Sequence, residues 1–150
     1  MYLVIGLKDL FKDGFAVRLV ILGVSSDIGL AFALYWASRG HEVYGTYRTM
    51  SGRLATESGS FRGIYWCDLK NPQSIDSCAN RLREEVGTWD VMLLCPGTME
   101  PIGRFDRCDF DQWADGILVN LTGPLRFLQK CLCFRTKNIA TVIFFAGGGS

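Results

Sequence analysis

Residues 23–29, with the sequence GVSSDIG, have the composition of a phosphate-binding turn. One glycine permits a tight turn after the apolar run before it, and the second permits close approach of a helix or a phosphate to the backbone. The N–H groups that open a helix, with about +0.5 charge from the helix dipole, attract phosphate oxygens. The residues predicted to bind a cofactor at this turn are Gly23, Ser25, Ser26, Asp27, Ile28 and Gly29.

A glycine pair in a loop is also compatible with a plain turn between a strand and a helix. The placement of this pair favours the phosphate-binding interpretation, because the pair joins the first strand to the first helix of an alternating pattern. The two serines add hydroxyl donors to those of the backbone.

Arg48 lies at the end of the second predicted strand, 19 residues beyond Gly29. An acidic residue here would accept hydrogen bonds from the ribose hydroxyls of NAD, whereas an arginine suits a 2′-phosphate. The planar guanidinium can donate two charge-assisted hydrogen bonds to that phosphate, and Arg53 is a candidate second cation. The alternative is a solvated arginine at a strand end. Together with the glycine turn, Arg48 favours NADP(H) over NAD(H).

The elements that must position these residues alternate between short apolar runs and longer amphipathic stretches. Such alternation predicts an α/β fold, a doubly wound parallel sheet of about five strands in three αβα layers. Residues 1–17 form an unassigned extension before a domain that spans residues 18–150. The predicted strands are 18–22, 42–47, 62–66, 90–95 and 140–146, and the predicted helices are 28–39, 71–86 and 111–135.

Two features qualify this assignment of elements. Residues 49–60 are polar and glycine-rich, which predicts a loop with at most a short helical turn. Gly123-Pro124 predicts a bend or a boundary in the last helix, because proline cannot continue the helical hydrogen bonds.

Composition excludes several classes of partner. The formal net charge is +1, so no overall field draws the chain to nucleic acid or to anionic lipid. No apolar run approaches the roughly 20 residues that span a bilayer. The six cysteines form no Cys-x-x-Cys pair and the chain has one histidine, so we expect no metal site. Reduced cysteines in apolar surroundings predict a cytoplasmic protein.

Residues 22–48 (LGVSSDIGLAFALYWASRGHEVYGTYR) resemble the opening of the short-chain dehydrogenases/reductases, whose pattern is Thr-Gly-x-x-x-Gly-x-Gly. Leu22 replaces the threonine and Asp27 replaces the middle glycine. The resemblance implies a Rossmann-type fold and hydride transfer between a nicotinamide and a carbonyl or alcohol substrate. Because a carboxylate repels phosphates, we expect Asp27 to cap the helix and to point away from the cofactor.

Further positions match the same family in order. The resemblance implies that Asp68 hydrogen-bonds the adenine amino group and that Leu69 packs near the ring; taken alone, Asp68 is a strand-terminal acid. Where the family shows Asn-Asn-Ala-Gly, this chain has Leu-Cys-Pro-Gly, which makes Cys95, Pro96 and Gly97 candidate cofactor-binding residues. We expect Cys95 to pack rather than react, since no histidine or lysine lies nearby in the sequence.

Asn120 lies in the predicted long helix, 23 residues after Gly97. It matches the catalytic asparagine of the family, whose implied role is to hold a helix kink open and to position a water in a proton relay. The alternative is a polar residue that bonds the backbone of its own helix.

The catalytic Tyr-x-x-x-Lys pair of the family is not found in this chain. Tyr44 has Arg48 at that spacing, but both lie on the second strand, where the family never places the pair. At the family's serine position the chain reads Ala146-Gly147, and Ser150 comes three residues late. These differences predict an incomplete family domain. The tyrosines, none with a lysine four residues on, are Tyr2, Tyr35, Tyr44, Tyr47 and Tyr65.

Two functions remain open: part of an NADP(H)-dependent oxidoreductase acting on a small-molecule substrate, or a non-catalytic NADP(H)-binding module or sensor. A nucleotide-sugar epimerase or dehydratase is disfavoured, because its Gly-x-x-Gly-x-x-Gly spacing does not fit this turn. The edge of the fifth strand and the long helix predict a homo-oligomer. The leucines expected to contribute on that helix are Leu118, Leu121, Leu125, Leu128 and Leu132.

Overall fold

Five short strands form the centre of the structure, a computed structural model that describes residues 16–145. All the pairings are parallel, and the strand order is β3-β2-β1-β4-β5. Residues 1–15 of the predicted extension, and the predicted strand end at Ala146, lie outside the described residues. The strands are β1 (Arg18–Leu22), β2 (Glu42–Tyr47), β3 (Gly63–Trp66), β4 (Val91–Leu94) and β5 (Thr141–Phe144).

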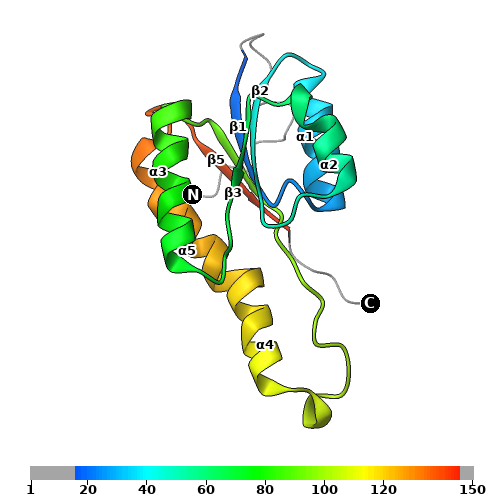
Figure 1. The fold of residues 1–150 in the computed structure, drawn as a ribbon. Helices are drawn as coiled ribbons and strands as arrows, with labels where there is room; N and C mark the ends of the chain where they lie inside the picture. The colour runs from blue at the N-terminus through cyan, green and yellow to red at the C-terminus, as the bar shows by residue number, and fades with distance from the viewer. Residues whose placement is uncertain (1–15, 146–150) are drawn as a thin grey trace.

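Helices lie on both faces of this sheet (Figure 1). α1 and α2 cover one face, α3 and α5 cover the other, and α4 extends away from the sheet. The α/β prediction of a doubly wound parallel sheet in three layers is therefore confirmed. No helix in residues 16–145 has the length and the apolar character to cross a membrane. The helices are α1 (Asp27–Ala37), α2 (Gly52–Glu57), α3 (Pro72–Val86), α4 (Phe110–Ile117) and α5 (Gly123–Cys131).

β1 lies at the point where the winding of the chain changes direction. From β1 the chain proceeds outward through β2 to β3, then returns to the other side of β1 to form β4 and β5. Leu22, the last residue of β1, pairs with Thr46 of β2 and with Leu94 of β4. The carboxyl ends of these strands therefore meet at one edge of the sheet, which is where ligands bind in such folds.

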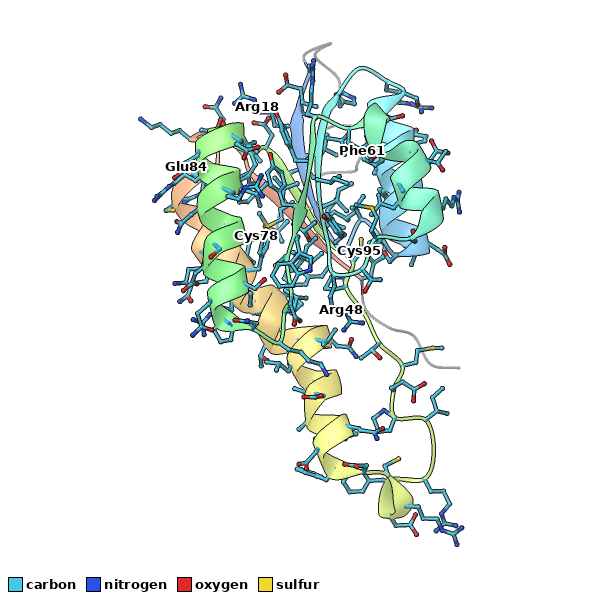
Figure 2. The ribbon with its side chains drawn as sticks, viewed as in Figure 1. Arg18, Arg48, Phe61, Cys78, Glu84 and Cys95 are labelled. Carbon is cyan, nitrogen blue, oxygen red and sulfur yellow. The ribbon has the colours of Figure 1, made fainter. Side chains whose placement is uncertain are left out.

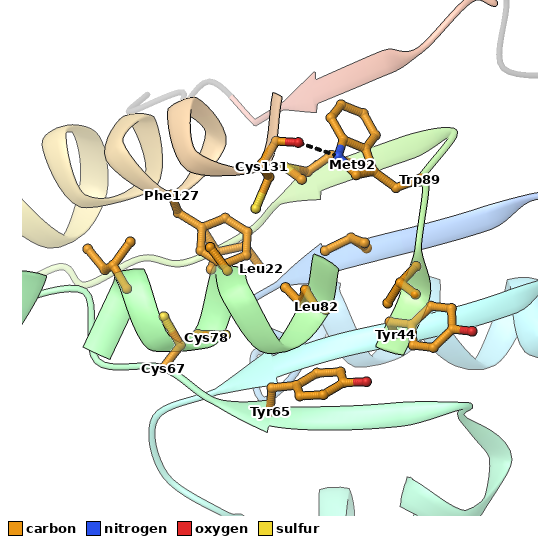
Figure 3. Packing of buried hydrophobic residues seen from close by; sticks show 14 of the residues in the cluster. Leu22, Tyr44, Tyr65, Cys67, Cys78, Leu82, Trp89, Met92, Phe127 and Cys131 are labelled. Carbon is orange, nitrogen blue, oxygen red and sulfur yellow. Dashed lines mark hydrogen bonds between the residues drawn. The ribbon is translucent and has the colours of Figure 1, made fainter. Parts of the chain in front are cut away.

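Apolar side chains fill both layers between helices and sheet. On the face covered by α3 and α5, Leu82, Trp89 and Phe127 are fully buried (Figure 3). The indole Nε1 of Trp89 donates a hydrogen bond of 2.9 Å to the carbonyl oxygen of Cys131. This bond satisfies the only polar atom of the ring and links the segment just before β4 to the end of α5.

The predicted long helix is not continuous, and Gly123-Pro124 marks a boundary in it, one of the two outcomes that the sequence predicts. A π-helical turn, Leu118–Thr122, separates α4 from α5. Gly123 and Pro124 begin α5 instead of bending the helix from within. A Cβ on Gly123 would lie 2.7 Å from the carbonyl oxygen of Leu118 and 2.9 Å from Cβ of Leu69. The glycine therefore permits α5 to start against the chain that follows β3.

Other boundaries differ from the predictions by a few residues. α1 ends at Ala37 rather than Arg39, and the chain then turns through Gly40, which has φ +84°. The helical turn allowed for in residues 49–60 is α2, followed by a 3₁₀ turn at Ser58–Ser60. α2 forms because the hydroxyl of Ser51 caps it and Leu54 is fully buried.

The packing against α3 predicts the effect of removing a core side chain. Leu82→Ala should lower the free energy of unfolding by about 2–5 kcal/mol, because it leaves a cavity in a fully packed region. The matched control is Ile102→Ala, whose side chain is 73% exposed and whose change should stay within about 0.5 kcal/mol. Urea denaturation followed by circular dichroism measures both. Equal effects of the two substitutions would contradict the packing described.

Candidate functional site

A cavity of about 280 Å³ opens where the strand ends meet. Its walls come from the carboxyl ends of β1, β2, β3 and β4 and from the π turn before α5. The Arg48 side chain lies at this end of the sheet, on the side of α4 (Figure 2). The lining residues are Leu22, Gly23, Ser25, Ser26, Thr46, Tyr47, Arg48, Cys67, Asp68, Leu69, Pro96, Gly97, Thr98 and Val119.

The turn between β1 and α1 excludes side chains at both predicted glycines. Gly23 has φ +86°, and a Cβ there would lie 3.0 Å from the nitrogen of Pro96. A Cβ on Gly29 would lie only 2.4 Å from the carbonyl oxygen of Gly23. The turn is also bound to itself, because the Ser26 hydroxyl donates to the Gly23 carbonyl at 2.9 Å. Both glycines are therefore required by the shape of the turn.

Ser26, not Asp27, caps α1, so the predicted capping role of Asp27 is wrong. The Ser26 hydroxyl accepts from the Gly29 N–H at 3.0 Å, and Asp27 is the first residue of the helix. A carboxylate in the first turn is favourable to the helix dipole without being the cap. Asp27 and Ile28 are exposed and, like the buried Gly29, are not among the residues that line the cavity. Of the six residues predicted at this turn, Gly23, Ser25 and Ser26 line it.

Thr46 is a cavity residue that the sequence interpretation missed. Its side chain is buried on β2, and its Oγ1 accepts from the Gly23 N–H at 3.1 Å. Its carbonyl oxygen accepts from the Val24 N–H at 2.8 Å. Thr46 thus holds two consecutive peptide groups of the turn. The available signal was a hydroxyl residue near the end of an otherwise buried strand.

Arg48 follows β2 and lines the cavity at its outer side. Its guanidinium has no ion-pair partner among residues 16–145, unlike the guanidinium of Arg18, which pairs with Glu42 at 3.1 Å. A smaller cavity of about 120 Å³ shares Arg48, Thr98 and Val119 with the first. Its wall also contains the ion pair between Lys70 and Asp115. Arg48 therefore offers to both cavities a cation that no described residue pairs with.

Asp68 and Leu69, which follow β3, both line the cavity. One carboxylate oxygen of Asp68, Oδ1, accepts from the Lys70 N–H at 3.0 Å, and the Asp68 N–H donates to the Ser74 hydroxyl at 2.8 Å. Leu69 is buried, and Val119 supplies a second apolar side chain to the wall. Val119 was not predicted, since nothing in the sequence distinguishes it from its apolar neighbours.

The segment after β4 contributes Pro96 and Gly97 to the cavity, but not Cys95. Burial raises the pKa of the Cys95 thiol to about 12, so the thiol stays protonated at neutral pH. This protonation agrees with the expected packing role. A Cβ on Gly97 would contact only Oδ1 of Asn120, at 3.9 Å. Space for a ligand therefore lies open beside Gly97.

Asn120 lies within the π turn and bonds to a different segment of the chain. Its Nδ2 donates to the Thr98 carbonyl at 2.9 Å, and its Oδ1 accepts from the Thr98 N–H at 2.8 Å. The alternative of bonding the backbone of its own helix is not what the structure shows. Asn120 does not line the cavity itself, but its two hydrogen bonds hold Thr98, which does line the cavity.

The tyrosines are dispersed over the fold. Tyr47 lines the cavity, Tyr35 is exposed on α1, and Tyr44 and Tyr65 are buried on β2 and β3. Burial and the hydrogen bond to Glu85 raise the pKa of Tyr65 far above its usual range. Within residues 16–145, no group of His, Cys, Asp or Glu side chains is placed to hold a metal ion. Four residues named in the sequence analysis, Tyr2, Ala146, Gly147 and Ser150, lie outside the described part.

Comparison with known proteins identifies the class to which this fold and cavity belong. A family model described as enoyl-(acyl carrier protein) reductase matches residues 23–148. A short-chain dehydrogenase/reductase of Penicillium canescens is 30% identical over 115 residues, which are 76% of this chain and 44% of that protein. An NADPH-dependent pterin aldehyde reductase of Arabidopsis thaliana is 29% identical over 131 residues, 83% of this chain and 54% of that protein.

Solved structures agree on the fold. A Serratia marcescens short-chain dehydrogenase/reductase superimposes with a TM-score of 0.75 at 16% identity, covering 83% of this chain and 53% of that one. An NADH-dependent reductase complexed with NAD superimposes with a TM-score of 0.72 at 18% identity, covering 83% of this chain and 54% of that one. The chain belongs to the short-chain dehydrogenase/reductase family. It spans about half the length of the curated relatives that it matches. Membership implies a nicotinamide cofactor.

The hydrogen bond from the Gly23 N–H to the Thr46 hydroxyl predicts that the stability of the turn depends on this hydroxyl. Thr46→Val keeps the shape but leaves the Gly23 N–H without its acceptor, which should lower the free energy of unfolding by about 1–3 kcal/mol. Thr46→Ser, which keeps the hydroxyl, should recover part of this loss. Thr56→Val, at an exposed position, is the control and should change stability by less than about 0.5 kcal/mol. Urea titration of the three variants tests this, and a neutral Thr46→Val would contradict it.

Proposed function

We propose that this chain is the cofactor-binding part of an NADP(H)-dependent oxidoreductase that acts on a carbonyl or alcohol group of a small molecule. The observation that carries the proposal is the guanidinium of Arg48, which lies beside the cavity at the end of β2 and has no ion-pair partner within residues 16–145. An unneutralised arginine at this point suits a 2′-phosphate, which distinguishes NADP(H) from NAD(H).

The other walls fit the remaining parts of a dinucleotide. Leu69 and Val119 offer apolar contacts to an adenine ring, and Asp68 is the candidate acceptor for its amino group. Ser25 and Ser26, with the opening turn of α1, offer hydroxyl and backbone donors to a diphosphate. A bound nicotinamide would supply or receive the hydride. The open space beside Gly97 leaves room for the ligand.

The matched proteins support a nicotinamide cofactor without distinguishing its two forms. One relative is named as NADPH-dependent, and one structural neighbour as NADH-dependent and complexed with NAD. Arg48 is therefore the feature of this chain that favours the phosphorylated form. In the same proposal Asn120 holds the β4–α4 connection at Thr98, and residues 18–150 form the cofactor-binding domain.

A non-catalytic NADP(H)-binding module is the second candidate. It is favoured by the substituted family positions, Asp27 in the glycine turn and Leu-Cys-Pro before Gly97. The parent transcript separates the two functions. A Tyr-x-x-x-Lys motif encoded in frame beyond residue 150 would support the oxidoreductase, and a stop codon directly after Ser150 would support the binding module.

The thiols support a reducing, cytoplasmic location as part of this proposal. All six cysteines are free, and three of them, Cys67, Cys78 and Cys131, are buried in the core. Burial raises the pKa of the Cys131 thiol well above its usual range, so this thiol remains a small apolar core group.

The role of Arg48 predicts a reversal of cofactor preference. Arg48→Asp should weaken NADPH binding by about 10- to 100-fold, because it replaces charge-assisted hydrogen bonds with repulsion. NADH binding should be retained or improved, since the carboxylate can accept from the ribose hydroxyls. Titration followed by tryptophan fluorescence measures both constants. Arg62→Asp is the control: it makes the same charge change just before the start of β3, at the opposite edge of the sheet from Arg48. Unchanged selectivity in Arg48→Asp would exclude Arg48 from cofactor recognition.

We further propose that the chain forms a homo-oligomer through the α4–α5 segment. Four exposed apolar residues repeat at four-residue spacing along it, namely Trp113, Ile117, Leu121 and Leu125. Leu118 and Leu128 of the predicted set are less exposed, and Leu128 packs against the core. β5 is the outermost described strand on its side of the sheet and offers a second surface.

The exposed stripe predicts that one charge will dissociate the oligomer. Leu121→Glu should shift the molar mass measured by light scattering from a multiple of the 16.8 kDa chain to the monomer value. Ile102→Glu, a like substitution on the exposed loop before α4, should leave the molar mass unchanged. A monomeric wild-type chain would contradict the proposal.

A further inference from the structure

Trp66, the last residue of β3, makes a side-chain hydrogen bond to the backbone of Arg48. Its indole Nε1 donates to the Arg48 carbonyl oxygen at 3.1 Å. The ring is 51% exposed, so burial alone does not explain its orientation. It lies on the outermost strand on this side of the sheet, beside the end of β2. The bond is the observation from which the inference starts.

The position of this bond in the sheet gives it a specific effect. The ladder between β2 and β3 ends at the pair Tyr47↔Trp66, and the last backbone bond beyond it runs from the Cys67 N–H to the Tyr47 carbonyl at 2.8 Å. Arg48 is therefore the first residue past the backbone ladder. The indole extends the hydrogen bonding by one residue, onto the peptide group that follows the Arg48 Cα.

We propose that Trp66 is a positioning residue for Arg48, and through it a determinant of the preference for a 2′-phosphate. The inference rests on the proposed function. Without the indole bond, the peptide after Arg48 would have rotational freedom, which the chain would lose on binding the phosphate. With the bond, the guanidinium starts from a fixed backbone at the mouth of the cavity. Preorganisation of this kind strengthens binding without adding a contact to the ligand.

The test uses two probes that differ only in the group to be recognised, 2′,5′-ADP and 5′-ADP. Trp66→Phe keeps an aromatic ring and removes the donor. The dissociation constant of 2′,5′-ADP should rise by about 2- to 10-fold, the range for one hydrogen bond, while that of 5′-ADP should stay the same. Isothermal titration calorimetry measures both without relying on tryptophan emission. Tyr35→Phe, which removes a polar group from another half-exposed aromatic residue, is the matched control on α1 and should change neither constant.

A double-mutant cycle separates positioning from general structural support. In an Arg48→Met background, Trp66→Phe should have no further effect on 2′,5′-ADP, because the group on which Trp66 acts is gone. Trp66→Leu, a second variant without the donor, should reproduce the single-variant result. Retained 5′-ADP binding shows in each case that the variant is folded.

The possible failures are distinguishable. Equal affinity of the wild-type chain for the two probes would overturn the proposed NADP(H) function and this inference together. A wild-type preference for 2′,5′-ADP that Trp66→Phe leaves unchanged would overturn the inference alone. Equal weakening of both probes, or an undiminished effect in the Arg48→Met background, would make Trp66 a structural residue and would also overturn it.

Discussion

The turn between β1 and α1 has its shape because β2 holds it from the side. Gly23 must adopt a positive φ, and its N–H and that of Val24 both point to Thr46, whose hydroxyl and carbonyl oxygens accept them. Because Thr46 accepts from both backbone N–H groups, the peptide groups of Gly23 and Val24 are fixed against β2. Ser25 and Ser26 of the same turn line the cavity at the carboxyl ends of the strands. The shape of this end of the cavity therefore depends on pairing between β1 and β2 in the observed register.

The order of the strands then determines which other residues can reach this turn. β1 lies between β2 and β4, so the segments that follow these two strands face one another across its end. Arg48 enters from the β2 side and Gly97 from the β4 side, while Asp68 enters from β3. The fourth wall comes from the π turn, where Val119 faces the cavity and Asn120 ties Thr98 in place. A continuous α-helix would change the direction of these two neighbouring side chains, because each additional residue in a turn rotates the positions that follow it.

The local features of this arrangement were predictable, whereas features that depend on tertiary contact were not. Apolar runs indicated the five strands, and the glycine turn after the first of them indicated the ligand edge of the sheet. Thr46 was missed because its hydroxyl was the only local signal, and its role depends on its pairing with Leu22 across the sheet. The cap of α1 was assigned to Asp27 rather than Ser26 because serine and aspartate are both common N-cap residues. Only the backbone geometry shows that Ser26 precedes the helix and that Asp27 is its first residue. Gly123-Pro124 indicated the boundary at which α5 begins, but no local pattern indicated the π turn that precedes it.

Charge balance explains why the selectivity of such a cleft can depend on one side chain. With a net charge of +1, the chain as a whole exerts little attraction on a phosphate, so any preference must arise within a few ångströms of the site. Lys70 lies nearby, but its ammonium group is paired with Asp115, which reduces its field at the cavity. The carboxylate of Asp27 does not line the cavity, which keeps the nearest acid of the turn out of its wall. Arg48 lines the cavity without an ion-pair partner among the described residues, and its carbonyl oxygen accepts a hydrogen bond from the Trp66 indole. An accessible charge and a hydrogen-bonded backbone thus coincide at Arg48, which is the combination that the proposed anion contact requires.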